Sequence, residues 1–144
     1  MSEPVLDTGE QIAKYLLESE LVDQVRLQSI LSTANCSIIA TDPITFKKIG
    51  KSESVFIRRL LILLVLSIND KGLPCSELHK ELVTKYKKIC GNVTLDMVKT
   101  DIKVLRFYQF LSTEKKQGTK GIIFDYAVQA FPQALVDGLK FAIN

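Results

Sequence analysis

The chain has 144 residues, of which 47% are hydrophobic and 24% are charged, a composition that fits one globular domain with a buried core. No stretch approaches the roughly 20 apolar residues of a membrane span, and the N-terminus lacks the regions of a secretory signal. We therefore expect a soluble, cytoplasmic protein. The three cysteines, Cys36, Cys75 and Cys90, are an odd number in such a chain, which predicts reduced thiols rather than disulfides.

The net charge of +3 conceals an uneven distribution. Residues 1–46 hold two basic and seven acidic residues (−5), whereas residues 47–144 hold seventeen basic and nine acidic residues (+8). The basic part suits an acidic protein face, an anionic membrane surface or nucleic acid. Because solvated lysine-rich surfaces are common, charge alone does not choose among these partners.

A long helix is predicted near the N-terminus. Thr8 and Gln11 have the spacing of a capping box, and apolar residues then recur at nearly helical intervals. We expect one helix from about Gly9 to Leu31, or two shorter helices if Glu18–Glu20 interrupts the apolar stripe.

The connection over residues 32–52 contains one further predicted helix. Asp42 and Pro43 suit a helix start, and Gly50 suits its end, so Pro43–Ile49 is expected to be helical. The short segment Ser37–Ala40 is a candidate third strand.

The most apolar stretch is Val55–Leu73, in which seven apolar residues run unbroken from Leu60 to Leu66. A run this apolar, but too short to cross a bilayer, predicts a helix buried on nearly all sides. We expect this helix to extend from about Glu53 to Ile68, before the turn at Gly72.

Two more helices are expected after this turn. Ser76 can cap the first, which Gly91 ends and whose buried side holds Leu78, Leu82 and Ile89. Thr94 can cap the second. Its apolar stripe consists of Leu95, Val98, Ile102 and Leu105, and its basic stripe of Lys99, Lys103 and Arg106.

After this helix, the spacing of the apolar residues changes from that of a helix to that of a strand. Phe110–Thr113 and Ile122–Val128 predict two strands joined by the polar loop Glu114–Gly121. Pro132 opens a last helix, whose apolar members are Ala134, Leu135, Val136, Leu139 and Phe141.

Three helices followed by a hairpin is the order of a winged helix. The expected fold class is therefore mostly α with a small β-hairpin, in one domain over residues 1–144. A helical N-terminal extension over 1–50 and a C-terminal helix over 131–144 would flank a winged-helix-like core over 51–130.

Candidate catalytic and metal-binding residues are few. His79 is the only histidine, and no serine or cysteine stands in a nucleophile motif, so we do not expect an enzyme. Cys75 and His79 supply two of the three or four ligands that zinc needs. We expect no metal and no cofactor, and we expect His79 to be a partly exposed helix residue.

Basic residues form the candidate partner-binding face. They are Lys99, Lys103 and Arg106 in the third helix of the core and Lys115, Lys116 and Lys120 in the hairpin. The helix offers mainly lysine rather than the Arg, Asn and Gln that read bases, and winged helices also serve as protein-binding modules. Protein binding is the main expectation, and DNA or RNA binding is the alternative.

A family resemblance agrees with protein binding. The segment Leu66–Leu73 (LSINDKGL), the helix after it that closes on Tyr86 and Gly91, and Phe110–Leu111 resemble part of the SM (Sec/Munc-type) vesicle-fusion family. The similarity is greatest to the vacuolar protein sorting subunit of the HOPS and CHEVI tethering complexes. It also includes Gly9–Ala13 and the helix that follows.

The SM resemblance implies a non-enzymatic adaptor or complex subunit in vesicle tethering. Tethering-complex subunits would be its partners, and it would lie at the periphery of endosomal or vacuolar membranes. Leu61 stands where the family has an arginine, and the domain that grips SNAREs is missing from this sequence, so the resemblance does not imply SNARE clasping.

A weaker resemblance is to the LOTUS family of winged helices, which bind RNA or a helicase. It is carried by Gly72–Leu73, Leu78, Tyr86 and Gly91, although the glycine-bearing turn of that family is absent. This resemblance implies nucleic-acid binding and, with it, a nuclear location.

Overall fold

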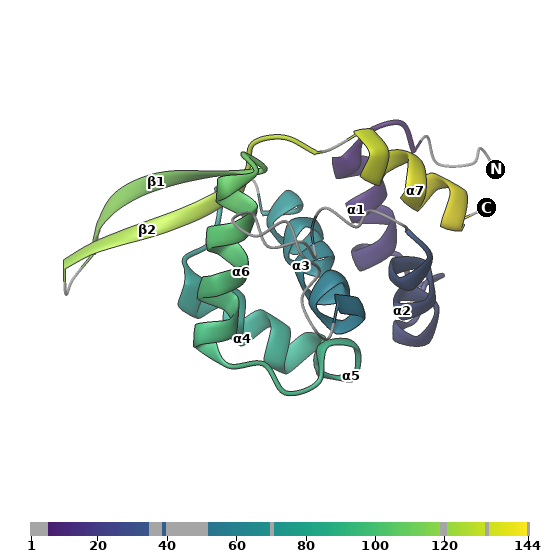
Figure 1. The fold of residues 1–144 in the computed structure, drawn as a ribbon, viewed down its shortest axis with the longest axis horizontal. Helices are drawn as coiled ribbons and strands as arrows, with labels where there is room; N and C mark the ends of the chain where they lie inside the picture. Colours follow the sequence, from purple (N-terminus) through teal and green to yellow (C-terminus); the bar gives the residue numbers. More distant parts are fainter. Residues whose placement is uncertain are drawn as a thin grey trace.

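The computed structural model describes residues 6–34, 39, 52–69, 71–118, 121–131 and 133–143. This part of the chain is mostly helical and has one two-stranded antiparallel sheet, which confirms the predicted fold class (Figure 1). The elements in chain order are α1 (Gly9–Glu18), α2 (Gln24–Thr33), α3 (Ser52–Ser67), α4 (Cys75–Lys85), α5 (Lys87–Cys90), α6 (Leu95–Phe107), β1 (Leu111–Gly118), β2 (Gly121–Val128) and α7 (Gln133–Ile143).

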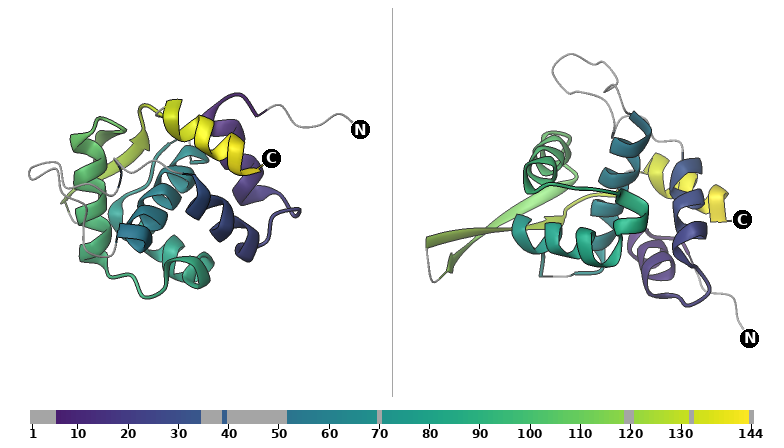
Figure 2. Two further views of the ribbon diagram at one scale, coloured as in Figure 1. Left: turned by 45° about the vertical axis from the view of Figure 1, so that its right-hand side comes forward. Right: turned by 90° about the horizontal axis from the view of Figure 1, so that it is seen from below.

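α3 is the centre of the molecule. Figures 1 and 2 show α1, α2 and α7 on one side of it and α4, α6 and the hairpin on the other. Every side chain from Val55 to Leu66 is buried, as the apolar run predicts. Each fully buried Leu, Ile or Phe contributes about 1.5–3 kcal/mol to the free energy of folding. This helix is therefore the main source of the hydrophobic core.

α3, α4, α6 and the hairpin have the order of a winged helix. The segment between α3 and α4 joins the hairpin, because Leu73 and Tyr126 exchange two backbone hydrogen bonds of 3.0 and 2.9 Å. The extra strand pairing thus comes from Leu73. Of the predicted strand Ser37–Ala40, only Ile39 lies within the described residues, and it is not in a strand.

Gly72 allows this pairing, and we expect its replacement to be costly. Its φ is +77°, and an added Cβ would lie 2.8 Å from the carbonyl oxygen of Tyr126. We expect Gly72→Ala to lower the free energy of unfolding by about 2–3 kcal/mol, measured by urea denaturation, because backbone strain and a clash add together.

Gly91→Ala is the matched control. Gly91 has a similar φ of +68°, but no described atom lies within 4 Å of its added Cβ. The Gly91→Ala variant should lose about 1 kcal/mol of unfolding free energy, which is the cost of the left-handed backbone conformation alone. Equal losses in the two variants would contradict the clash at Tyr126.

The N-terminal helix is divided, so the prediction of one helix over Gly9–Leu31 is wrong and the two-helix alternative is confirmed. The predicted capping box of Thr8 and Gln11 opens α1. The chain becomes extended at Ser19, and the Asp23 side chain then accepts a hydrogen bond of 2.8 Å from the Arg26 amide to begin α2. The segment from Ser19 to Asp23 therefore separates the two helices.

The helix between the turn and Gly91 also differs in detail from the prediction. It begins at Cys75, after Pro74, without a side-chain cap, so the prediction that Ser76 is the cap is wrong. It is interrupted at Tyr86 and continues as the short α5, which ends at Gly91 as predicted.

The hairpin is longer than predicted. Glu114–Gly118, expected to be loop, pairs with β2 through Gly118 and Gly121. β1 is polar because the hairpin projects from the molecule (Figure 1). Its composition therefore resembles that of a loop, and the strand could not be predicted from it. The predicted helix over Pro43–Ile49 lies outside the described residues.

α7 is a helix as expected, although two of its predicted apolar members do not pack. Leu135, Val136 and Leu139 are buried, but Ala134 is exposed and Phe141 is 80% exposed. The apolar face of α7 is therefore narrower than its composition indicates. Pro132 lies outside the described residues.

Candidate functional site

α6 presents a basic stripe to solvent. Lys99, Lys103 and Arg106 are exposed, whereas Val98, Ile102 and Leu105 on the other side are buried. Spacings of three and four residues place the three cations on one side of the helix. Neither Lys99 nor Lys103 forms an ion pair with another described residue, so their charges are available to a partner.

Lys115 extends this stripe onto the hairpin. It lies opposite Phe124 in the strand register, with its Nζ 5.9 Å from the centroid of that ring. Phe124 and Tyr126 share one face of β2 because side chains alternate along a strand, and the Arg106 guanidinium lies 5.9 Å from the Tyr126 ring. Lys115 is therefore on the hairpin face that meets α6.

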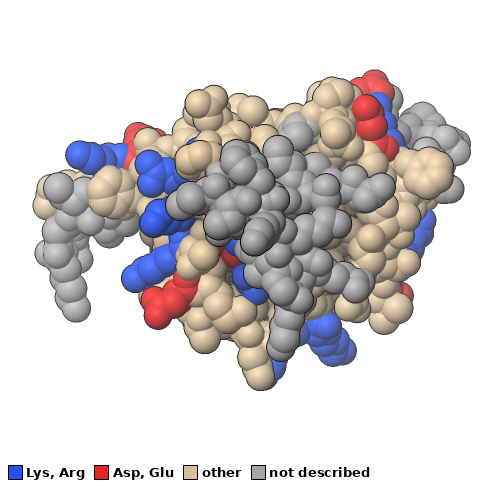
Figure 3. Space-filling view, in the orientation of Figure 1, with Lys and Arg blue, Asp and Glu red and all other residues tan. Residues whose placement is uncertain are grey.

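The two remaining predicted cations are less well defined. Lys116 pairs with Ile123 in the strand register, but its side chain lies outside the described part of the structure, as does the whole of Lys120. We define Lys99, Lys103, Arg106 and Lys115 as the basic face. Figure 3 shows Lys and Arg side chains gathered over α6 and the adjoining hairpin.

A groove of about 790 Å³ lies between the C-terminal end of α6 and the base of the hairpin. Two cations of the basic face, Lys103 and Arg106, line it, together with a phenylalanine ring and two glutamine side chains, from Phe107, Gln109 and Gln129. The groove thus combines positive charge, an aromatic ring and amides, which can bind a charged, ring-containing ligand.

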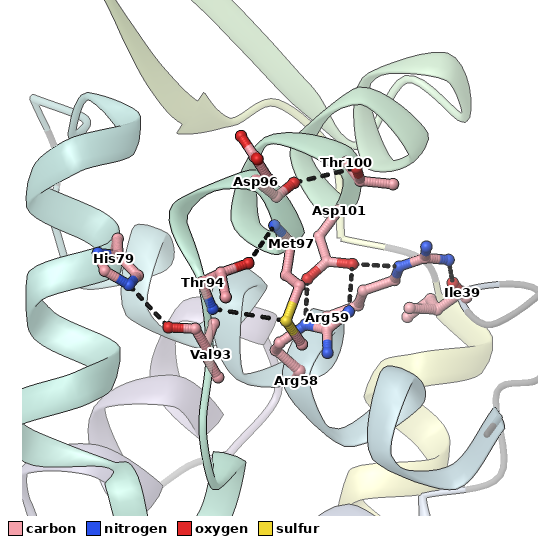
Figure 4. A network of polar contacts seen from close by, with 10 residues as sticks. All are labelled: Ile39, Arg58, Arg59, His79, Val93, Thr94, Asp96, Met97, Thr100 and Asp101. Carbon is pink, nitrogen blue, oxygen red and sulfur yellow. Dashed lines mark hydrogen bonds and ion pairs between the residues drawn. The ribbon is translucent and has the colours of Figure 1, made fainter.

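A buried ion cluster fixes α6 to the central helix (Figure 4). Arg58 donates to both oxygens of the Asp101 carboxylate, including a bond of 2.9 Å from Nη2 to Oδ1, and Arg59 donates from Nε to Oδ1 at 2.9 Å. Arg59 also donates from Nη1 to the Ile39 carbonyl at 2.7 Å. The hydrogen bond to Asp101 raises the pKa of Arg58, so this guanidinium stays charged.

The turn before α6 is held at two further points (Figure 4). His79 Nε2 donates to the Val93 carbonyl at 2.8 Å, since a carbonyl can only accept. The Thr94 hydroxyl accepts from the Met97 amide at 3.2 Å, the predicted N-cap. His79 is partly buried, as expected. These contacts set the start and orientation of α6.

The described cysteines are free thiols. Burial raises the pKa of Cys90 to about 11 and also raises that of Cys75, so both are protonated at neutral pH and poor nucleophiles. Cys36 lies outside the described residues.

The described residues contain neither a metal-binding cluster nor a membrane-spanning helix. No three His, Cys, Asp or Glu side chains in these ranges are grouped so that they could hold a metal ion. Within the same ranges, no helix is both long and apolar enough to cross a membrane.

The described residues thus combine the helix and hairpin order of a winged helix with a basic face on α6 and the hairpin. No protein-family model, no curated protein and no solved structure matches the chain. The resemblances to the SM and LOTUS families therefore remain predictions.

Proposed function

We propose that this chain is a non-enzymatic winged-helix module that binds nucleic acid through the basic face. The observation that carries the proposal is that Lys99, Lys103 and Arg106 are exposed on one side of α6, and that Lys115 lies on the hairpin face whose Tyr126 ring is next to Arg106. In helix-turn-helix proteins that bind DNA, the third helix and the wing contact phosphates. The corresponding elements here are α6 and the hairpin.

The acidic part of the chain does not oppose this use. Residues 6–34 carry five acidic and two basic side chains. Glu10 at the start of α1 lines a pocket with Ala127 and Val128 at the end of β2, but most of α1 and all of α2 lie on the side of α3 away from the hairpin (Figures 1 and 2). Exposed charges more than about 10 Å apart are largely screened at 0.1 M salt. The acidic helices therefore leave the basic face attractive to phosphate.

Salt dependence tests the proposal. We expect short fluorescent oligonucleotides to bind at low salt, and the logarithm of the association constant to fall with the logarithm of salt concentration with a slope of about −2 to −4, as three or four neutralised phosphates release counterions. Fluorescence anisotropy measures both quantities. If neither duplex DNA nor single-stranded RNA or DNA binds at low salt, the proposal is wrong.

A protein-binding adaptor is the second candidate. It is favoured by three large apolar residues away from the hairpin: Leu21 between α1 and α2, Val25 in α2 and Phe141 in α7, which are 75%, 79% and 80% exposed. Affinity purification from cells tests the tethering version of this candidate. Recovery of nucleic-acid-binding proteins without tethering subunits or SNAREs would remove it.

A further inference from the structure

We infer that the ligand of the basic face is a single-stranded nucleic acid, whose unpaired bases contact the groove between α6 and the hairpin. This inference rests on the proposed function and adds the class of ligand to it. Three features of the described residues carry it: exposed aromatic rings beside the cations, amides in the groove, and an α6 surface poorly suited to a duplex groove.

Exposed aromatic rings accompany the cations of the basic face. Phe107 follows Arg106, is 61% exposed and lines the groove; Phe124 is 41% exposed and lies beneath the Lys115 ammonium. The Phe107 ring is largely open to solvent, whereas the Phe124 ring is partly open and is shared with the Lys115 ammonium. Aromatic rings beside a positively charged groove stack on bases and accept any base, since every base has a π-face. A paired base inside a duplex offers no such free face.

Two glutamine side chains of the groove can bind the polar edges of bases. Gln109 and Gln129 both line it with exposed side chains, and an amide group offers donors and an acceptor for the edges that unpaired bases expose. Gln109 has a φ of +65°, a conformation that costs a residue with a side chain about 1–2 kcal/mol. Two hydrogen bonds hold this turn in place. The backbone N–H of Gln109 donates to the Arg106 carbonyl, and the side-chain Nε2 of Gln129 donates to the backbone carbonyl of Gln109.

The start of α6 is unfavourable for reading a duplex. The N-terminal part of a recognition helix contacts base edges, and here its exposed residues are Asp96, Lys99, Thr100 and Lys103. The Asp96 carboxylate repels phosphate, and none of the four is an Arg, Asn or Gln, whose planar groups make bidentate contacts with purines, whereas a lysine offers only a point charge. The cationic and aromatic groups instead lie toward the C-terminal end of α6, beside the groove.

The test compares ligands and ring variants by fluorescence anisotropy. We expect oligo-U and oligo-dT to bind at least about 10-fold more tightly than a blunt duplex of the same length, and Phe107→Leu and Phe124→Leu each to weaken single-strand binding by about 10-fold, as lost base stacking predicts. Comparison of oligo-U with oligo-dT shows whether the strand is RNA or DNA.

Phe141→Leu is the control, because this phenylalanine is still more exposed, at 80%, but lies on α7, away from the basic face. It should bind like the unchanged protein, and thermal unfolding should show that all three variants fold. Duplex binding as tight as single-strand binding, or full affinity in both ring variants, would overturn the inference and leave the proposed function standing. Absence of binding to every oligonucleotide would overturn both.

Discussion

The double variant Lys103→Glu, Arg106→Glu is expected to lose nucleic-acid binding almost completely. Both residues line the groove and belong to the exposed stripe of α6. The substitutions remove two phosphate contacts and place two carboxylates at the same positions, so the affinity should fall by about 100-fold or more at low salt. Because both side chains are exposed, thermal stability should change little. Anisotropy titration measures the first effect and circular dichroism the second.

The matched control is Lys87→Glu, Lys88→Glu on α5. It makes the same change in net charge at two exposed lysines outside the basic face. It should weaken binding by about 10-fold at most, through the general field of the protein. Equal losses in the two double variants would mean that net charge, rather than the α6 face, attracts the nucleic acid.

Asp101→Ala is expected to have the largest effect on stability. Its carboxylate accepts hydrogen bonds from Arg58 and Arg59, which are 8% and 1% exposed, and is itself fully buried. Removing it leaves two buried guanidinium groups without their counter-charge, which costs about 3–5 kcal/mol. Urea denaturation at neutral pH measures the loss.

Asp96→Ala is the control for Asp101→Ala, because Asp96 is an exposed aspartate in the first turn of the same helix. It should cost at most about 1 kcal/mol, the contribution of a negative charge near a helix N-terminus. A further variant combines Asp101→Leu with Arg58→Met and Arg59→Met, which should recover much of the stability because no buried charge remains. A loss below 1 kcal/mol for Asp101→Ala would contradict the structural role of the cluster.

The main elements of the fold could be predicted because local signals agree with the tertiary structure. The unbroken run Leu60–Leu66 indicates a buried helix, and Thr94 and Gly91 mark helix ends through their capping chemistry. The division between α1 and α2 and the length of the hairpin depend on weaker signals. Polar residues are compatible with helix, strand or loop, so propensity alone does not decide them.

The buried ion cluster was not predicted, although the sequence contains a sign of it. Asp101 falls on the apolar side of α6, three residues after Val98 and next to Ile102, where an unpaired carboxylate would be very costly. Arg58 and Arg59 are likewise the only charges within the apolar run from Val55 to Leu66. An acid on one apolar stripe and two bases in another helix indicate a buried pair, but their contact depends on the packing of α3 against α6.

The groove could be predicted only in part. The basic residues of α6 follow from helical spacing, but the exposure of Phe107 and Phe124 does not, since an aromatic residue in a helix or strand is usually buried. Lys115 was predicted to lie in a loop, so the strand register that places it opposite Phe124 could not be predicted.

Mapping the ligand on the folded protein tests the central claim most directly. A ¹⁵N-labelled sample titrated with a single-stranded oligonucleotide should show amide chemical-shift changes in α6, from Lys99 to Phe107, and in β1 and β2, while α1 and α2 remain unchanged. Changes confined to α1, α2 and α7, or no change at ligand excess and low salt, would contradict nucleic-acid binding through the basic face.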